Sequence, residues 1–479
     1  PPRSTLFPYT TLFRSSVPAW VKDSIFYQIF PDRFCNGDMG NDPANVLPWG
    51  AKPTIQGFQG GDLRGVIERM YYLLDLGINA IYFNPIFLSP STHRYNTVDY
   101  YRIDPKLGSK QDFETLLDVA HRNQIRVVLD GVFNHCGRGF FAFSDILENQ
   151  SHSPYADWFH VRQFPVDAYS SGDATTFIGW WKYKSLPKFN TGNNEVRKYI
   201  FNAARYWLEQ GIDGWRLDVP NEIDDDGFWD EFRQVVKSTN PEAYLLGEIW
   251  DGDPHWVGDH HFDGLMHYPV RTLIMDLLSE EINAGNFMKA SFDWLNHYPI
   301  ENAYAMYTTL GSHDTERVYS LLEKSIEKTK LAFLFLLTYP GAPAIYYGDE
   351  IGTEGGKDPE CRHTFNWEET SWKIELRQWI KALIRVRKDR NSLRRGDFQP
   401  LTVSGGNAFA FSRTDGKDSV LVVGNVSDQR NKIVIDLANC PLKEKQMLRS
   451  MSGTERYNIE DGKLFIEINR WCGLILGSE

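Results

Sequence analysis

Hydrophobic and polar positions follow two rhythms from residue 20 to residue 394. Short runs of β-branched or aromatic residues alternate with longer stretches whose apolar side chains recur at helical spacing. The short runs predict strands over residues 25–34, 78–86, 126–135, 214–219, 243–250, 262–268, 307–314 and 342–350. Strands that alternate with helices form parallel sheets, so this segment predicts an α/β fold, a closed (β/α)₈ TIM barrel.

The longer stretches predict the helices that surround such a barrel. Helical spacing is clearest over residues 63–76, 110–123, 194–210, 226–239 and 328–338. Residues 136–190 are too many for a loop between a strand and a helix, and they are rich in aromatic residues and turn formers. We therefore expect an inserted subdomain after the third strand.

The two ends of the chain depart from this pattern. Residues 395–479 contain short alternating strands separated by Asp, Gly and Asn turns, which predicts a C-terminal antiparallel β-sandwich domain. Residues 5–15 read TLFPYTTLFRS, which looks like the in-frame translation of a sequencing adapter. We therefore expect residues 1–19 to be a non-native leader and linker, and we exclude them from fold reasoning.

Composition and charge argue against two classes of binding partner. The 479 residues include 51 Lys and Arg against 63 Asp and Glu, a net charge of −12, and no basic run that would track a phosphate backbone. No apolar run reaches the length of a membrane span, about 18 residues. The five scattered cysteines form no CxxC pair. We expect free thiols in a cytoplasmic protein, with neither a nucleic acid nor a membrane as partner.

Polar residues end four of the predicted strands. The third ends in DGVFNH (130–135), the fourth in GWRLD (214–218), the fifth in GEIW (247–250) and the seventh in GSHD (311–314). In a (β/α)₈ barrel the carboxyl ends of the strands meet at one mouth, which is where catalytic groups lie. The sequence therefore predicts an active site formed by these four strand ends.

Three carboxylates at this mouth fit the cleavage of a glycosidic bond, which needs a nucleophile, a proton donor and a group that stabilises a cationic transition state. Arg216 precedes Asp218 by two residues and shares its face of the strand, so we expect the cation to keep Asp218 ionised as nucleophile. Glu248 has apolar neighbours that raise its pKa, which favours an acid/base role. Asp314 beside His313 would bind the distorted sugar.

The strings DGVFNH, GWRLDV, GEIW and SHD resemble the four signature regions of glycoside hydrolase family 13, the α-amylase family. The resemblance spans about residues 20–479 and implies the same three roles for the carboxylates. It also implies that the attacked glucose is held by Tyr95, His135, Arg216 and His313.

Finer features are similar to the neopullulanase, cyclomaltodextrinase and maltogenic amylase branch: LPKFN at 186–190, the pair Asn221-Glu222, and Ser312 in the fourth region. The branch resemblance implies that Asp358 and Arg362 bind the next glucose and that Trp250 stacks on the leaving-group side. Members often begin with a starch-binding-type domain that helps form dimers. We expect a homodimer if the native protein carries such a domain.

A second group of polar residues lies on turns and suits a hard cation. It comprises Asn36, Asp38, Asn41, Asp42, Gly60 and Asp62. Oxygen ligands of this kind favour Ca²⁺ over zinc, and the branch resemblance implies a structural Ca²⁺ site. A competing interpretation is an Asx-rich turn that forms without metal.

The sequence leaves the roles of three polar residues open. Asp130 is a structural ion pair of Arg216 in one interpretation and a further site residue in the other, while Asn221 and Glu222 are additional candidates for substrate contact. The leading hypothesis is a retaining hydrolase of α-1,4-glucosidic bonds in maltodextrins, cyclodextrins, pullulan or starch. Its rivals are a non-catalytic carbohydrate-binding family member and a transglycosylase or α-glucosidase that uses the same site.

Overall fold

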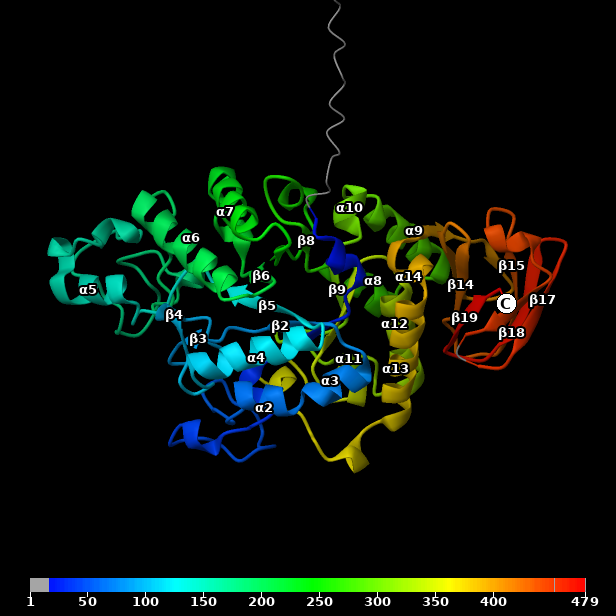
Figure 1. Ribbon diagram of the computed structural model, residues 1–479, viewed down its shortest axis with the longest axis horizontal. Coiled ribbons are helices and arrows are strands. Elements are labelled where there is room, and N and C mark those ends of the chain that lie inside the picture. The colour runs from blue at the N-terminus through cyan, green and yellow to red at the C-terminus, as the bar shows by residue number, and fades with distance from the viewer. Residues whose placement is uncertain (1–16, 452, 479) are drawn as a thin grey trace, which may run out of the picture.

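A closed ring of parallel strands forms the centre of the molecule, as seen in a computed structural model that describes residues 17–451 and 453–478 (Figure 1). The strands are β1 (Phe26–Ile29), β2 (Ala80–Phe83), β5 (Arg126–Gly131), β6 (Gly214–Leu217), β7 (Tyr244–Gly247), β8 (Gly264–Leu265), β9 (Tyr307–Thr309) and β10 (Ala342–Tyr346). They follow one another around the sheet in chain order. A parallel bridge from Met266 to Tyr307 joins β8 to β9. The predicted barrel is confirmed.

Most strands end earlier than the sequence indicated. The predicted strand 25–34 is wrong in its second half, because Pro31–Phe34 form the short helix α1; a proline nitrogen cannot donate to a strand ladder but fits the first turn of a helix. The predicted strand 262–268 likewise ends at Leu265, and α8 (Tyr268–Leu278) begins with a proline in its first turn. The residues that leave the ladder at these ends supply the side chains of the mouth.

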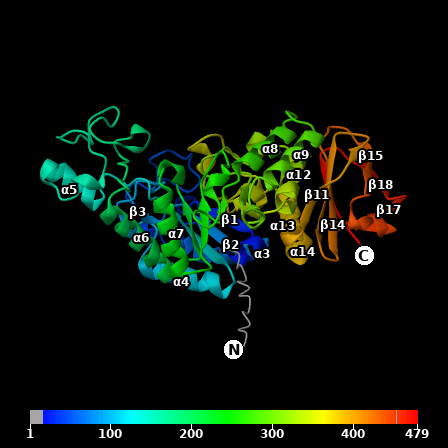
Figure 2. The same cartoon turned by 90° about the horizontal axis from the view of Figure 1, so that it is seen from above.

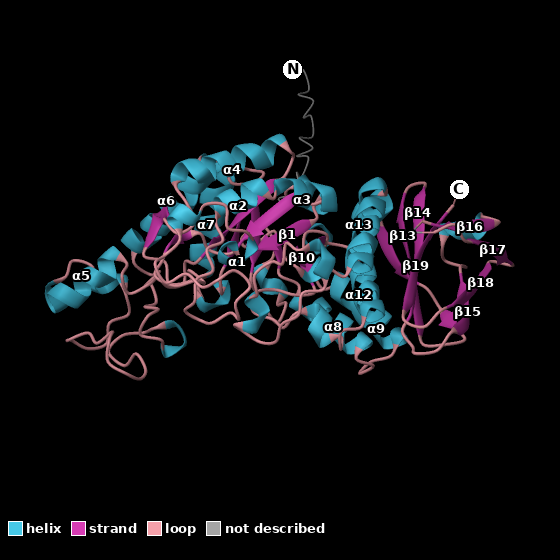
Figure 3. Cartoon of the chain, turned by 90° about the horizontal axis from the view of Figure 1, so that it is seen from below, coloured by secondary structure: helices cyan, strands magenta, loops and turns pink. Residues whose placement is uncertain are grey.

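Helices pack around the strands (Figure 3). The longer ones are α2 (Leu63–Glu68), α3 (Met70–Leu76), α4 (Lys110–Arg122), α6 (Asn194–Glu209), α7 (Asp226–Thr239), α8, α9 (Ala284–Leu295), α12 (Ile326–Thr338) and α13 (Ile374–Asp389). Shorter ones are α10 (Ile300–Ala303), α11 (Val318–Leu321) and α14 (Asn391–Arg395). The single predicted helix 63–76 is divided at Arg69 into α2 and α3. The residue pattern did not predict α8, α9 or α13.

An extension between β5 and α6 lies at one end of the molecule, where Figure 2 shows α5 (Phe141–Asn149). Apart from α5 it has short 3₁₀ turns and isolated bridges, and its interior is aromatic: Phe143 packs on Phe159 and Phe177. The extension returns beside the barrel through a bridge between His135 and Lys188. A separate two-stranded sheet, formed by β3 (Phe87–Leu88) and β4 (Asp99–Ile103), lies between β2 and β5 in the chain.

Antiparallel strands form the C-terminal part of the chain. They are β11 (Asp397–Pro400), β12 (Val403–Ser404), β13 (Ala408–Asp415), β14 (Asp418–Asn425), β15 (Asn431–Asp436), β16 (Met447–Ser450), β17 (Arg456–Glu460), β18 (Lys463–Ile468) and β19 (Cys472–Gly477). Leu421, Ile435 and Leu464 share a core of their own. Phe409 and Phe411 on the opposite face pack on Phe335 of α12 and so join this part to the barrel.

The remaining predictions concern the start of the chain, the cysteines and a membrane span. The adapter-like residues 5–15 lie outside the described residues, whereas Val17 is already buried in the cluster of Phe26 and Tyr244. All five cysteines are free, as predicted: Cys35, Cys136, Cys361, Cys440 and Cys472. In the described ranges, no helix combines the length and the apolar composition of a membrane span.

Candidate active site

The register of three neighbouring strands gathers carboxylates at the barrel mouth. Asp130 of β5 lies opposite Arg216 of β6. Leu217 lies opposite Gly247 of β7, so Asp218 and Glu248 follow in step where the two strands end. The Glu248 amide still donates to the Leu217 carbonyl at 3.1 Å. Since adjacent strands lie about 4.8 Å apart, the register alone places these two carboxylates side by side.

One guanidinium holds this group together. Arg216 Nη1 lies 2.8 Å from Asp130 Oδ1 and 2.9 Å from Asp218 Oδ1, and Arg216 Nη2 lies 2.9 Å from Glu248 Oε2. Glu248 Oε2 also accepts from the backbone amide of Val219 at 3.0 Å. Arg216 is completely buried, so its attraction for these carboxylates is only weakly screened by water.

Asp314 is joined to the same group from the other side of the mouth. His313 Nε2 lies 3.0 Å from Asp314 Oδ2 and 2.7 Å from the Tyr95 hydroxyl. Tyr95 in turn donates to Asp130 Oδ2 at 2.9 Å. Gln28 Nε2 lies 3.0 Å from His313 Nδ1, which would accept this hydrogen bond in the tautomer with the hydrogen on Nε2. All three predicted catalytic carboxylates therefore belong to one connected network.

Access to solvent differs among the three carboxylates. Asp218 is 7% exposed and Glu248 4%, whereas the Asp314 side chain is 32% exposed. Asp314 is therefore the carboxylate of the site that is most open to solvent. A ligand that contacts all three carboxylates would be largely shielded from water.

Burial sets the protonation of the two inner carboxylates. It raises the pKa of Glu248 to about 7, with Arg216 opposing and the charge of Asp314 adding to the shift. It also raises the pKa of Asp218 well above its usual range, and the charges of Glu248 and Asp130 add to this rise. Arg216 lowers the pKa of Asp218, in the expected direction, but desolvation opposes this effect and is larger. The charge of Glu248 adds to the rise in the pKa of Asp218, so a proton on Glu248 favours the anionic form of Asp218 beside Arg216.

The predicted histidines are neutral and one has a free nitrogen. Burial lowers the pKa of His135 to about 3 and that of His313 well below its usual value. His135 stacks on Trp180 with ring centroids 5.1 Å apart, and its buried Nε2 has no hydrogen-bond partner among the described residues. Since an unpaired buried polar atom costs about 1–3 kcal/mol, a sugar hydroxyl is the natural partner for this nitrogen.

Two tryptophans present flat faces to solvent near this group. Trp250 is 49% exposed, stacks on Tyr268 at 3.8 Å, and directs its Nε1 to Glu248 Oε1 at 3.3 Å. Trp181 is also exposed and stacks on Trp180 at 4.7 Å. Rings held in this way suit stacking on a sugar ring.

Arg362 connects two of the other predicted residues. Its Nη1 lies 3.2 Å from Asp358 Oδ1, its Nη2 lies 3.2 Å from Asp314 Oδ1, and its Nε donates to the His313 carbonyl at 2.9 Å. The predicted pair Asp358 and Arg362 therefore lies directly beside Asp314, away from the buried Arg216.

The two branch-type segments contact each other. Asn221 and Glu222 lie in a 3₁₀ turn (Pro220–Glu222) after Asp218. Lys188, within the segment 186–190, donates to the Glu222 carbonyl and lies 3.9 Å from its carboxylate. The Asn221 side chain is exposed. These residues lie close to Asp218 in the chain but outside the carboxylate network.

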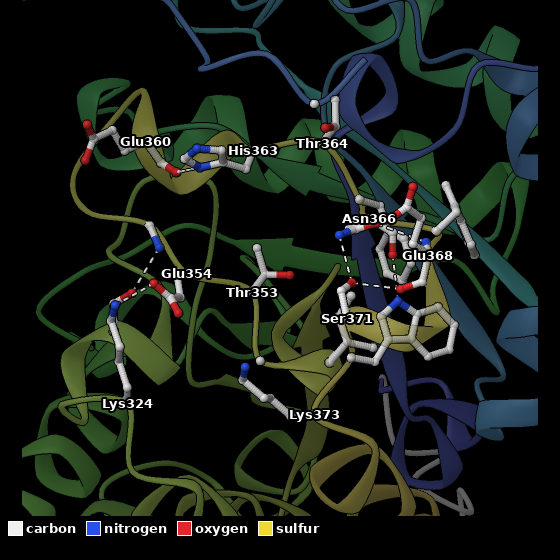
Figure 4. Close-up of a pocket in the computed structure, with 18 of the residues that line it drawn as sticks. Lys324, Thr353, Glu354, Glu360, His363, Thr364, Asn366, Glu368, Ser371 and Lys373 are labelled. Atoms are coloured by element: carbon white, nitrogen blue, oxygen red, sulfur yellow. Dashed lines mark hydrogen bonds and ion pairs between the residues drawn. The ribbon is translucent and has the colours of Figure 1, made fainter.

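A cavity of about 1000 Å³ lies next to the segment that carries Arg362, and Figure 4 shows its lining. Lys324 and Glu354 form an ion pair of 2.7 Å on one side of it. None of the three predicted catalytic carboxylates lines it. The cavity is therefore distinct from the barrel-mouth network.

Comparison with known proteins identifies the family. The family model for the α-amylase catalytic domain matches residues 28–396. The chain belongs to the α-amylase family. It is a glycoside hydrolase of α-glucans, and its resemblance to the cyclomaltodextrinase, neopullulanase and maltogenic amylase branch is confirmed.

Relatives of this α-amylase family member cover most of its length. A cyclomaltodextrinase from Geobacillus thermopakistaniensis is 42% identical over 455 residues, 94% of this chain and 76% of the relative. Neopullulanase 2 from Thermoactinomyces vulgaris is 42% identical over 481 residues, 99% and 81% of the two chains. The solved structure of a cyclic α-maltosyl-(1→6)-maltose hydrolase from Arthrobacter globiformis has a TM-score of 0.87 at 34% identity, covering 96% of this chain and 100% of that one.

Gln28 and Asn84 of the site were not assigned from the sequence, whereas the role of Asp130 was left open there. Asp130 is fully buried, and its Oδ2 accepts from Tyr82 at 2.6 Å as well as from Tyr95. This geometry is that of a structural ion pair. Gln28 Nε2 donates to Asn84 Oδ1 at 3.0 Å, and together they orient His313 and Tyr95. Polar residues inside or just after apolar strands were the signal that could have revealed them.

The predicted calcium ligands also lie together. Asp62 Oδ2 accepts from the Asp38 amide at 2.8 Å and from Asn41 Nδ2 at 3.1 Å, and Asn36 Nδ2 donates to Asp42 Oδ1 at 3.0 Å. The side-chain oxygens of Asn36 and Asn41 are buried without partners in the part of the chain that the structure describes. Partial burial raises the pKa of Asp42, and the charges of Asp62 and Asp38 add to the rise.

Gly60 completes this cluster through its lack of a side chain. Its φ is +83°, and an added Cβ would lie 2.3 Å from Asp42 Oδ1. Unpaired amide oxygens beside several carboxylates are a donor set that fits a hard cation such as Ca²⁺.

Proposed function

We propose that this enzyme hydrolyses α-1,4-glucosidic bonds with retention of anomeric configuration through a covalent glycosyl-enzyme intermediate. The observation that carries the proposal is the register of β6 and β7, which sets Asp218 and Glu248 side by side on one guanidinium. Retaining glycosidases have carboxyl groups about 5–5.5 Å apart, whereas inverting ones leave room for a water at about 6.5–9.5 Å. Adjacent strands in register favour the shorter separation.

The proposed mechanism needs an ionised Asp218 and a protonated Glu248, and the raised pKa of Glu248 supports the second of these states. Asp218 attacks the anomeric carbon as the anion beside Arg216 while Glu248 gives its proton to the glycosidic oxygen. The leaving sugar departs with that proton. Glu248, now a carboxylate, takes a proton from water, and the resulting hydroxide displaces Asp218 and restores both groups.

The surrounding residues bind and orient the sugar. Asp314 is the carboxylate most open to solvent, and we assign it contacts to the ring hydroxyls that strengthen as the ring distorts. The unpaired Nε2 of His135 forms a hydrogen bond with a further hydroxyl of the same glucose. Asp358 and Arg362 bind the neighbouring glucose.

The substrates we propose are maltodextrins, cyclodextrins, pullulan and starch. The similarity to a cyclomaltodextrinase and to a neopullulanase supports cyclodextrins and pullulan in particular. We also propose a cytoplasmic location, which the five free thiols support.

Proton NMR of the first products tests the proposal. With β-cyclodextrin, pullulan or soluble starch, the reducing ends should appear first as the α-anomer and only later equilibrate. Early β-anomer would show inversion and overturn the covalent intermediate. Binding of maltooligosaccharide without turnover would favour a non-catalytic family member. Longer products at high maltose concentration would favour a transglycosylase.

Trp250→Ala should weaken substrate capture. Removing the ring that stacks on Tyr268 takes away a sugar-stacking face, so we expect kcat/KM for a cyclodextrin to fall by about 5–30-fold, corresponding to about 1–2 kcal/mol, mainly through KM. Trp250→Phe keeps a ring but loses the Nε1 contact to Glu248. A loss in the Phe variant as large as in the Ala variant would show that the contact to Glu248, not stacking, is what Trp250 supplies.

We also propose that the cluster around Asp62 binds a structural Ca²⁺. A ligand present at 100 times its Kd stabilises the folded state by about 2.7 kcal/mol, so chelation with EDTA should lower Tm by roughly 5 °C. Asp42→Ala should lower Tm in Ca²⁺ and show no further fall with EDTA. Asp118→Asn on the exposed face of α4 should respond like the wild type. A wild-type Tm that EDTA leaves unchanged would favour the metal-free turn.

A further inference from the structure

A second cluster of metal-ligating side chains lies outside the catalytic network and the calcium cluster. Asp226 is in the first turn of α7, the helix that follows β6 and Asp218. His255 is in a 3₁₀ turn (Pro254–Trp256) after the Glu248 segment, and His261 precedes β8. The start of α7 and the connection between β7 and β8 therefore meet at this cluster.

The three side chains converge on one point. Asp226 Oδ1 lies 2.9 Å from His255 Nε2 and 3.0 Å from His261 Nε2. One potential ligand atom from each residue lies within 4.8 Å of the other two. In a tetrahedral zinc site with bonds of about 2.0–2.1 Å, ligand atoms are about 3.3 Å apart, so small side-chain movements would bring these atoms into place.

The backbone around the two histidines is already fixed. The His255 amide donates to the Asp253 side chain at 2.9 Å, which caps that turn. The His261 carbonyl accepts from Arg233 Nη1 of α7 at 2.9 Å, and its amide donates to the Gly258 carbonyl at 3.3 Å. Little conformational freedom would be lost on binding a metal, which favours affinity.

The ligand chemistry selects the cation. Two imidazole nitrogens with one carboxylate oxygen suit zinc and similar transition metals, whereas Ca²⁺ prefers oxygen ligands only. Three protein ligands leave a position for water. His255 is 48% exposed, so a metal can reach the cluster from solvent.

We propose that Asp226, His255 and His261 bind one zinc-class cation and thereby join the segment after β6 to the segment after β7. These segments follow the strands that carry Asp218 and Glu248. The bound cation would act as a cross-link between them, with no part in the chemical steps.

Calorimetric titration of the tag-free protein with Zn²⁺ tests this proposal. Millimolar Ca²⁺ is included so that the calcium cluster is filled and does not compete. We expect one Zn²⁺ per chain for the wild type. His255→Ala should weaken binding by about 100-fold or more, because loss of an outer-shell partner alone costs about 10–100-fold in metal affinity and His255 is a direct ligand. His261→Ala should do the same, but His255 is the preferred target because its exposure leaves the core intact.

His260→Ala is the matched control. His260 lies in the same segment and contacts Asp230 at 2.9 Å, but it is outside the cluster. This variant should bind Zn²⁺ like the wild type. Absence of binding by the wild type, or equal binding by His255→Ala, would overturn the proposal and leave three hydrogen-bonded side chains.

A second measurement reports the cross-link without using activity. Zn²⁺ should slow protease cleavage between residues 251 and 261 in the wild type and in His260→Ala, but not in His255→Ala. Co²⁺ in place of Zn²⁺ should give the visible absorption of a four-coordinate site in the same two proteins. Equal protection of His255→Ala would show that the cation binds elsewhere.

Discussion

Asp218→Asn should reduce the hydrolysis of cyclodextrin, pullulan and starch by a factor on the order of 10⁴ or more. An amide cannot form the acylal bond to the anomeric carbon that the proposed mechanism requires, so only binding and general electrostatic effects remain. The substitution also replaces a carboxylate that burial and two neighbouring charges disfavour. The fold should therefore persist, with Tm equal to or above that of the wild type. Reducing-sugar release and thermal melting measure the two effects.

Asp224→Asn is the control for this substitution. Asp224 is an exposed aspartate in the loop between β6 and α7, and it has no place in the carboxylate network. Its kcat/KM should stay within about twofold of wild type. Wild-type activity in Asp218→Asn would remove Asp218 as the nucleophile.

Glu248→Gln should lower kcat for glucan hydrolysis by about 10²–10⁴-fold, the usual contribution of a positioned acid/base. The loss of rate in Glu248→Gln should depend on the leaving group of the substrate. Fluoride needs little protonation, so α-maltosyl fluoride should still glycosylate the variant rapidly. Hydrolysis of the intermediate would remain slow without a base, and mass spectrometry should detect the covalent sugar. Equal losses with the fluoride and with the glucan would contradict the acid/base role.

The pH dependence supplies a second test of Glu248. Since burial raises its pKa to about 7, the wild type should lose kcat/KM as pH rises through about 7 and the acid gives up its proton. The folded state also holds this proton between the ordinary pKa of 4.5 and about 7, so stability should fall as pH rises across that window. Glu248→Gln should lack both changes, whereas Glu242→Gln on the exposed turn before β7 should keep them.

The barrel could be predicted from the residue pattern because each strand and helix is encoded by its own short stretch of sequence. Apolar runs that alternate with amphipathic stretches fix strands and helices, and eight such runs admit few arrangements. Strand ends were less predictable: Pro31 turns the end of the first predicted strand into helix α1. Helices α8 and α9 were missed between the sixth and seventh predicted strands.

The sequence also singled out the three carboxylates that the structure joins in one network. Asp218, Glu248 and Asp314 each follow an apolar strand, and parallel strands in a closed barrel bring such ends to one mouth. The pKa of Glu248 was predicted in the right direction, because apolar neighbours along the strand already indicate desolvation.

Only the folded structure could show how those groups act on one another. Contact of Arg216 with carboxylates from three strands depends on the register of β5, β6 and β7, which no local pattern encodes. The rise in the pKa of Asp218 depends on burial by distant segments, and the meeting of Asp226 with His255 depends on how two loops pack. Local propensity selects strands and helices, whereas desolvation and charge coupling arise from contacts between residues far apart in the chain.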